Sequence, residues 1–206
     1  MGFGQERFIT IWSEDTSSVN HPPTGRKLKH PIGFFLGSVT EKVVRLSSIP
    51  VLTARMQPDE QLVFPYENIL IPTDGSAGAA LAAEHGLSLA AALDATVHVL
   101  SVVDETSLGL DVRSTISGRE REQAATDAVD DLVSEAETHG VSNSVRHVEH
   151  GSPIEVILDT IDSNDIHAVV MGTTGRRGSD RILLGSVAEK TVRSAPVPVI
   201  TVGQGE

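Results

Sequence analysis

The chain has 206 residues, 39% of them hydrophobic, no cysteine, and a formal net charge of −12. This length and composition are typical of a packed globular protein with one domain and an extension, or with two small domains. The absence of cysteine excludes disulfides and thiolate metal sites, so we expect a reducing compartment such as the cytoplasm. No run of about 18 apolar residues occurs and no signal peptide pattern starts the chain, so we expect no membrane partner.

The charge is distributed unevenly along the chain. Residues 1–65 carry seven basic and six acidic residues, whereas residues 66–206 carry nine basic and 22 acidic residues. An acidic segment whose only lysine is Lys190 repels phosphate backbones, so we expect no nucleic acid partner. The acidity suits either simple solubility or a salty cytoplasm, where a high net charge keeps proteins dispersed.

The first 65 residues contain few periodic segments. Residues 1–32 include the polar run SEDTSSVNHPPTG, and we predict that they are disordered. Residues 33–56 are assigned from a repeat described below, and residues 57–65 are a linker to the segment that follows.

Residues 66–206 alternate apolar runs with helical patterns. Apolar and β-branched runs predict strands over residues 68–73, 95–103, 143–149, 166–171 and 198–202. Helical spacing of apolar residues predicts helices over residues 77–93, 120–139, 153–163 and 186–194. The last two helices each begin with a Ser-x-x-Glu capping box, at Ser152 and Ser186. This alternation, with connections too long for hairpins, predicts an α/β fold with a parallel sheet and helices on both faces.

Two of the predicted strands end in residues that suit anion binding. The first strand runs into PTDGS (72–76), and the fourth into GTTGRRG (172–178), followed by LGSV (184–187). In an open parallel sheet, ligands bind beyond the carboxyl ends of the strands. The spacing G-x2-G-x9-G-S lets the backbone approach an anion and places Gly185 and Ser186 at a helix N-terminus. The pattern predicts a phosphate site, although a single glycine could be only a turn and Ser186 only a helix cap.

Other chemistries find little support. Arg176 and Arg177 lie outside the glycines and are interpreted as solvated loop residues. No G-x-x-x-x-G-K-S/T run occurs, and no G-x-S-x-G elbow supports a Ser-His-Asp hydrolase. His147 and His150 are the only close pair of histidines, and their odd spacing puts them on opposite faces of a strand. We therefore predict no metal ligand and no catalytic residue.

The spacing G-x2-G-x9-G-S after the fourth strand, with PTDGS after the first, resembles the ATP-binding subclass of the universal stress protein family over residues 66–203. The resemblance implies a Rossmann-like fold of the adenine nucleotide alpha hydrolase type, with five parallel strands in the order 3-2-1-4-5. It also implies ATP between strands one and four, with Mg or Mn bridging the phosphates. Carried over by position, the implied site comprises Pro72, Thr73 and Asp74 at the adenosine end, Val102 at the adenine, Met171, Gly172, Thr174 and Gly175 along the ribose and phosphates, and Gly185, Ser186 and Val187 at the terminal phosphates.

A sequence repeat indicates how the N-terminal segment is organised. Residues 36–53 (LGSVTEKVVRLSSIPVLT) align without gaps on residues 184–201 (LGSVAEKTVRSAPVPVIT), with 11 of 18 positions identical and an offset of 148. Together with the resemblance, this predicts that residues 33–56 are the last helix and strand of a truncated first domain, and residues 66–206 a complete one. Members of the family often pair their fifth strands antiparallel across a dimer. We therefore expect either a homodimer or an intrachain pseudo-dimer edge, with residues 51–54 beside residues 199–202.

Three functions are compatible with this pattern. We prefer an ATP-binding regulatory or stress-response module without strong catalytic activity. A slow ATPase or phosphohydrolase of the same fold, or a structural pairing module that no longer binds nucleotide, are the alternatives. A hydrolase needs a positioned base near the γ-phosphate, and Asp74 is expected at the adenosine end, too far to serve.

Overall fold

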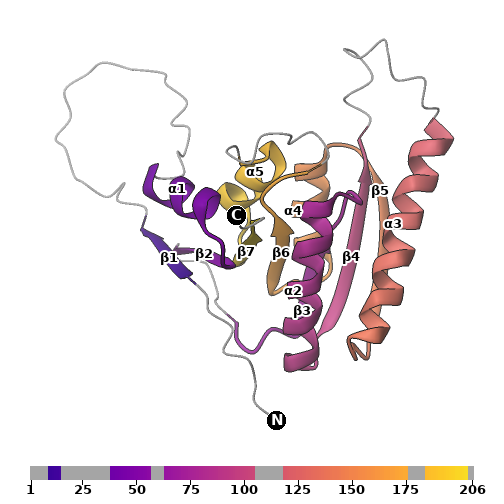
Figure 1. Ribbon diagram of the computed structural model, residues 1–206, viewed down its shortest axis with the longest axis horizontal. Helices are drawn as coiled ribbons and strands as arrows, with labels where there is room; N and C mark the ends of the chain where they lie inside the picture. Colours follow the sequence, from indigo (N-terminus) through magenta and orange to yellow (C-terminus); the bar gives the residue numbers. More distant parts are fainter. Residues whose placement is uncertain (1–8, 15–37, 57–62, 105–117, 176–183, 204–206) are drawn as a thin grey trace.

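The computed structural model describes residues 9–14, 38–56, 63–104, 118–175 and 184–203, and every structural statement below concerns these residues (Figure 1). In chain order, the elements are β1 (Ile9–Glu14), α1 (Ser38–Leu46), β2 (Val51–Met56), β3 (Asn68–Pro72), α2 (Ala77–Leu93), β4 (Thr96–Val103), α3 (Gly118–Thr138), β5 (Ser144–His150), α4 (Pro153–Ser163), β6 (Ala168–Gly172), α5 (Ser186–Ser194) and β7 (Val199–Val202).

One sheet of seven strands, in the order β1-β2-β7-β6-β3-β4-β5, forms the centre of the fold. The strands β3 to β7 are mutually parallel and follow the predicted order 3-2-1-4-5. The strand β2 pairs antiparallel with β7, and β1 pairs parallel with β2. The predicted α/β class is therefore confirmed. The predicted count of five strands was too low, because the N-terminal segment adds two strands at the β7 edge.

Helices cover both faces of this sheet, and each face has its own buried cluster (Figure 1). Ile69 and Ile71 of β3 pack with α2 and α3, whereas Leu70 between them packs with α4 and α5. Successive strand side chains point to opposite faces, so a strand buried on both faces is apolar at every position. None of the described helices combines the length and the hydrophobicity needed to cross a bilayer.

The small side chains of α2 let this helix lie close to the sheet. A β-carbon at Gly86 would lie only 2.7 Å from Cδ1 of Ile71. The alanines at 82, 83 and 90 are buried in the same cluster. A larger residue on this face would push the helix away from β3.

The helices α4 and α5 begin where they were predicted, but without the predicted capping boxes. Gly185, not Ser186, is the N-cap of α5, and Glu189 pairs instead with Arg193, at 2.6 Å between Oε1 and Nη2. Ser152 is the N-cap of α4, but its side chain makes no capping hydrogen bond. The structural alternative for Ser186, that its hydroxyl only caps the helix, is therefore wrong.

The strand β1 contradicts the prediction that residues 1–32 are disordered. Its six residues form a parallel ladder with β2, from Ile9 opposite Val51 to Glu14 opposite Met56. The sequence ITIWSE is rich in β-branched and aromatic residues, but the polar run that follows it obscured this signal. The other residues of the range 1–32 lie outside the described part of the chain.

Candidate functional site

Two loops meet at the carboxyl ends of β3 and β6, which are adjacent strands in the sheet. The chain continues from β3 to β4 on one side of this pair and from β6 to β7 on the other. Such a divergence opens a crevice above the sheet, where α/β proteins bind ligands. The predicted site residues from both strands therefore lie at a topological switch point.

The loop after β3 is held by hydrogen bonds within it and to β4. The Thr73 amide donates to the carbonyl oxygen of Leu100, at 2.8 Å. The Gly75 amide donates to Thr73 Oγ1 at 3.1 Å, and the Ser76 amide donates to Asp74 Oδ1 at 3.0 Å. Gly75 has a φ of 72°, which glycine adopts without strain. The loop thus fixes the Asp74 carboxylate beside the start of α2.

The loop after β6 touches both the β3 loop and α2. A β-carbon at Gly175 would lie 2.7 Å from Asp74 Oδ2, and one at Gly172 would lie 2.6 Å from the carbonyl oxygen of Gly78. Gly172 is therefore required for packing, because the atoms it faces are backbone, whereas Gly175 faces only the end of the Asp74 side chain. Gly78 itself faces the carbonyl oxygen of Thr174, where a β-carbon would collide. Sequence reasoning missed Gly78; its only signal was a glycine in the first turn of an alanine-rich helix.

The N-terminus of α5 is bonded to the same loop. The Gly185 amide donates to the carbonyl oxygen of Thr173 at 2.7 Å, and the Glu189 amide donates to Gly185 at 2.9 Å to begin the helical bonding. The amides of residues 186–188 therefore have no partner within the helix. Ser186 is exposed at this end.

Two helix N-termini converge on the loop after β6. Gly78 in the first turn of α2 and Gly185 at the N-cap of α5 both lie against Thr174. Each N-terminus carries the positive end of a helix dipole, so together they favour an anion at this loop. The first turn of α2 contains no acidic residue, and Glu189 in the first turn of α5 is paired with Arg193.

The apolar members of the predicted site lie on the face of the sheet that α4 and α5 cover. Val102 and Val187 are half-buried there, against the cluster that contains Met171. Met171 is only 5% exposed, so a ligand can contact its backbone but not its side chain. Arg176 and Arg177 lie outside the described residues.

One pair of histidines was missed. His147 of β5 lies opposite Leu100, so His98 of β4 is its diagonal neighbour on the same face. Nδ1 of His98 lies 3.1 Å from Nε2 of His147, and the rings stack with their centroids 5.3 Å apart. Burial lowers the pKa of both rings, and His147 lowers the pKa of His98 further. The prediction that His147 and His150 are the only close pair of histidines was therefore wrong, because strand register cannot be seen in sequence spacing.

This pair is not part of a larger metal-binding group. Within the described ranges, no three histidine, cysteine, aspartate or glutamate side chains are placed to hold a metal ion. The two rings therefore act as a hydrogen-bonded link between β4 and β5.

The sequence pattern of the Universal stress protein family matches residues 65–203, which include both loops and the start of α5. The chain belongs to this family. A universal stress protein of Methanocaldococcus jannaschii is 37% identical over 141 residues, covering 66% of this chain and 82% of that protein. The solved structure of the universal stress protein UspA from Lactobacillus plantarum is 26% identical, with a TM-score of 0.58, and the match covers 66% of this chain and 97% of that chain.

Two more distant structures share the fold of this universal stress protein. A functionally unknown protein from Pseudomonas aeruginosa PAO1 matches 95% of this chain and 63% of its own, at 22% identity and a TM-score of 0.58. That match therefore extends into the N-terminal segment. A universal stress protein solved in complex with cAMP matches 68% of this chain and 98% of its own, at 19% identity and a TM-score of 0.54.

Proposed function

We propose that this universal stress protein binds ATP at the carboxyl ends of β3 and β6, and that it acts as a regulatory or stress-response module without strong catalytic activity. The observation that carries the proposal is the convergence of the N-termini of α2 and α5 on the loop after β6. Two positive dipole ends beside a glycine-rich backbone suit a polyphosphate better than a neutral ligand.

The residues present fit a nucleotide. The backbone of residues 172–175 and the amides of residues 186–187 would hold the phosphates, with the Ser186 hydroxyl donating to a phosphate oxygen. The adenosine would lie at the end of β3, beside Pro72, Thr73 and Asp74, with the backbone of Val102 at the adenine. A divalent cation, Mg or Mn, would bridge the phosphates and neutralise part of their charge.

There is a specific reason to test a second adenine nucleotide, cAMP, at the same site. One fold neighbour was solved with cAMP, which shares the adenosine and one phosphate with ATP. A cyclic phosphate carries a single negative charge, so two converging helix dipoles favour ATP over cAMP. We therefore expect ATP to bind more tightly.

Calorimetric titration of Mg-ATP into the full chain tests the proposal. We expect one site, weakened about tenfold or more by Ser186→Ala, because a hydrogen bond to a charged phosphate is lost. Ser152→Ala is the matched control, since Ser152 also lies at a helix N-terminus but its side chain makes no capping bond. Gly175→Val is less informative, because its side chain would also collide with Asp74.

Each outcome separates the three candidate functions. The regulatory module is supported if Mg-ATP binds, if Ser186→Ala weakens this binding and Ser152→Ala does not, and if cAMP competes poorly. In that case no ADP is formed. Rapid ADP formation would favour the ATPase. No binding of either nucleotide would leave the structural pairing module.

A further inference from the structure

The N-terminal elements β1, α1 and β2, here called the N-terminal unit, repeat β6, α5 and β7 in space. Val169 of β6 lies opposite Val199 of β7, and the strands are parallel. Ile9 of β1 lies opposite Val51 of β2, again in parallel. Val51 and Val199 are equivalent in the sequence repeat, so the two ladders have the same register. The N-terminal unit is therefore a copy of the last strand, helix and strand of the complete domain.

The two copies are related by a local two-fold axis. In the antiparallel ladder between β2 and β7, Leu52 lies opposite Ile200, and these residues are equivalent in the repeat. Val51 lies opposite Thr201, as a two-fold axis requires. An axis between antiparallel neighbours in one sheet is perpendicular to that sheet, so α1 and α5 lie on the same face and run in opposite directions. The end of α1 therefore lies at the level of the start of α5.

The end of α1 contacts the candidate nucleotide site. Ser47 directly follows α1, and a β-carbon at Gly203 would lie 3.0 Å from the carbonyl oxygen of Ser47 and 3.6 Å from Thr173 Oγ1. Thr173 in turn accepts the amide hydrogen bond of Gly185, the N-cap of α5. One glycine thus separates the last turn of α1 from the loop after β6.

Arg45, in the last turn of α1, lies on the side of this helix that faces α5. Its equivalent in α5 is Arg193. The helix α4 covers the side of α5 that carries Val187 and Thr191, and it also contacts β4, so this side points away from β2. Arg193 lies about 200° further round the helix than Thr191 and therefore points toward β2 and α1. The two-fold axis then directs Arg45 toward α5.

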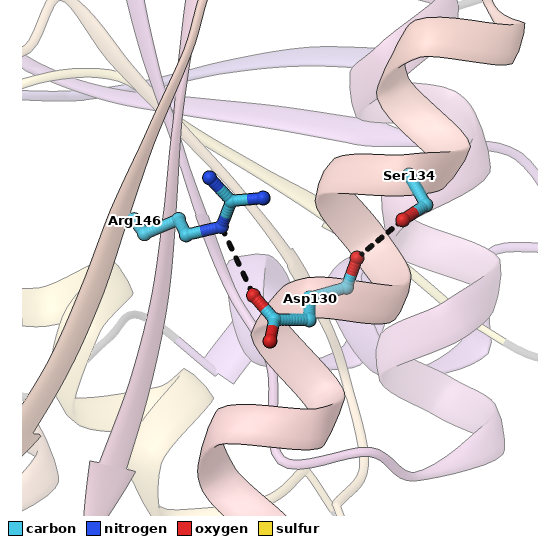
Figure 2. A network of polar contacts seen from close by, with 3 residues as sticks. All are labelled: Asp130, Ser134 and Arg146. Carbon is cyan, nitrogen blue, oxygen red and sulfur yellow. Dashed lines mark hydrogen bonds and ion pairs between the residues drawn. The ribbon is translucent and has the colours of Figure 1, made fainter.

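Arg45 has no partner among the described residues. It is half-buried, its Nε is buried without a hydrogen-bond partner, and no described carboxylate forms an ion pair with it. The equivalent Arg193 is paired, with Nη2 at 2.6 Å from Oε1 of Glu189. Arg146 is also paired, with Nε at 3.0 Å from Oδ1 of Asp130 (Figure 2). A buried donor without an acceptor costs free energy, and an anionic ligand would supply the acceptor that Arg45 lacks.

A polyphosphate suits this arginine. A guanidinium matches phosphate oxygens with two parallel, charge-assisted hydrogen bonds. Helix dipoles and backbone amides supply only partial charges at the start of α5. The surrounding segment is acidic, since residues 66–206 carry 22 acidic and nine basic residues, whereas residues 1–65 carry six and seven. A full positive charge from the N-terminal unit would offset the repulsion between this segment and a polyphosphate.

We propose that Arg45 completes the nucleotide site, with its guanidinium donating to the terminal phosphates of ATP bound at the start of α5. This inference rests on the proposed binding of ATP. The N-terminal unit then has two roles, because it covers the edge of β7 and also carries a cation to the site. AMP lacks the terminal phosphates and does not depend on Arg45.

Calorimetric titration of Mg-ATP and of AMP into the full chain and its variants tests the proposal. We expect Arg45→Gln to weaken Mg-ATP about tenfold, because a charged hydrogen bond is lost, and to leave AMP unchanged. Glutamine is a good helix former and the position is partly exposed, so folding is retained. A basic residue in a last turn also stabilises its helix, but loss of that effect would act on both nucleotides alike.

Lys42→Gln is the matched control. It removes the same charge from the same helix, but Lys42 lines the open side of α1 with Val43, Leu46 and Ser47. We expect it to leave both nucleotides unchanged. Arg45→Lys is the second variant, because it keeps the charge at the end of α1 and loses the paired donors. We expect it to weaken Mg-ATP less than Arg45→Gln does, and to spare AMP.

The outcomes separate this inference from the proposed function. Absence of Mg-ATP binding to the unmodified chain would refute the proposed function, and this inference with it. Mg-ATP binding that Arg45→Gln weakens no more than Lys42→Gln does overturns the inference alone. Equal losses for Mg-ATP and AMP would show that Arg45 only supports the fold, which also overturns it.

Discussion

At Gly172, the backbone of β6 passes so close to α2 that a β-carbon would lie 2.6 Å from the carbonyl oxygen of Gly78 and 2.8 Å from its carbonyl carbon. Neither atom belongs to a side chain that could rotate away. We expect Gly172→Ala to lower the free energy of unfolding by about 1–3 kcal/mol, because the helix must shift from the sheet. Urea denaturation measures this change.

Gly118→Ala is the control for the substitution itself. A β-carbon at Gly118 meets no atom within 4 Å. We expect its effect to stay within about 0.5 kcal/mol, as for most surface substitutions. Similar losses in both variants would show that close approach at Gly172 is not the cause.

Among the elements, β4 and β5 are joined by the hydrogen bond between His98 and His147 as well as by their ladder. Burial lowers both pKa values from the ordinary 6.5. Below pH 6.5 the unfolded chain therefore binds more protons than the folded one. The stabilisation from the neutral pair is complete above pH 6.5 and is lost as the pH falls from 6.5 through the lowered pKa values.

The His147→Gln variant should consequently lose less stability than the unmodified chain between pH 7 and about pH 5. Thermal unfolding across this range measures the difference. His150→Gln is the control, because His150 is an exposed residue of the same strand whose side chain is 47% exposed. Parallel pH profiles for the unmodified chain and His147→Gln would contradict the assignment.

In the whole molecule, the N-terminal strand β2 covers the edge of β7 through the ladder from Val51 to Thr53. This confirms the predicted intrachain pairing. An uncovered edge strand is a template for another chain. We expect a truncated chain of residues 60–206 to self-associate through β7 at concentrations where the full chain does not, and sedimentation velocity measures both. The same oligomeric state for both chains would refute a capping role.

The sequence by itself determined the α/β class and the two loops of the candidate site, which follow from local signals, namely apolar runs and glycine spacing. The order of the five parallel strands was implied by the resemblance to the universal stress protein family. The predicted pairing of residues 51–54 with residues 199–202 combined the sequence repeat with the strand pairing that the family resemblance implies. All of these patterns lie within short segments of the chain.

Only the tertiary structure decided the remaining features. The strand β1 is held by its pairing with β2, the partner of His147 is set by register between β4 and β5, and Gly78 is required because β6 approaches α2. Each depends on which segments become neighbours and how they are aligned. A one-residue change of register would exchange the faces of every strand residue, so such contacts cannot be read from local composition.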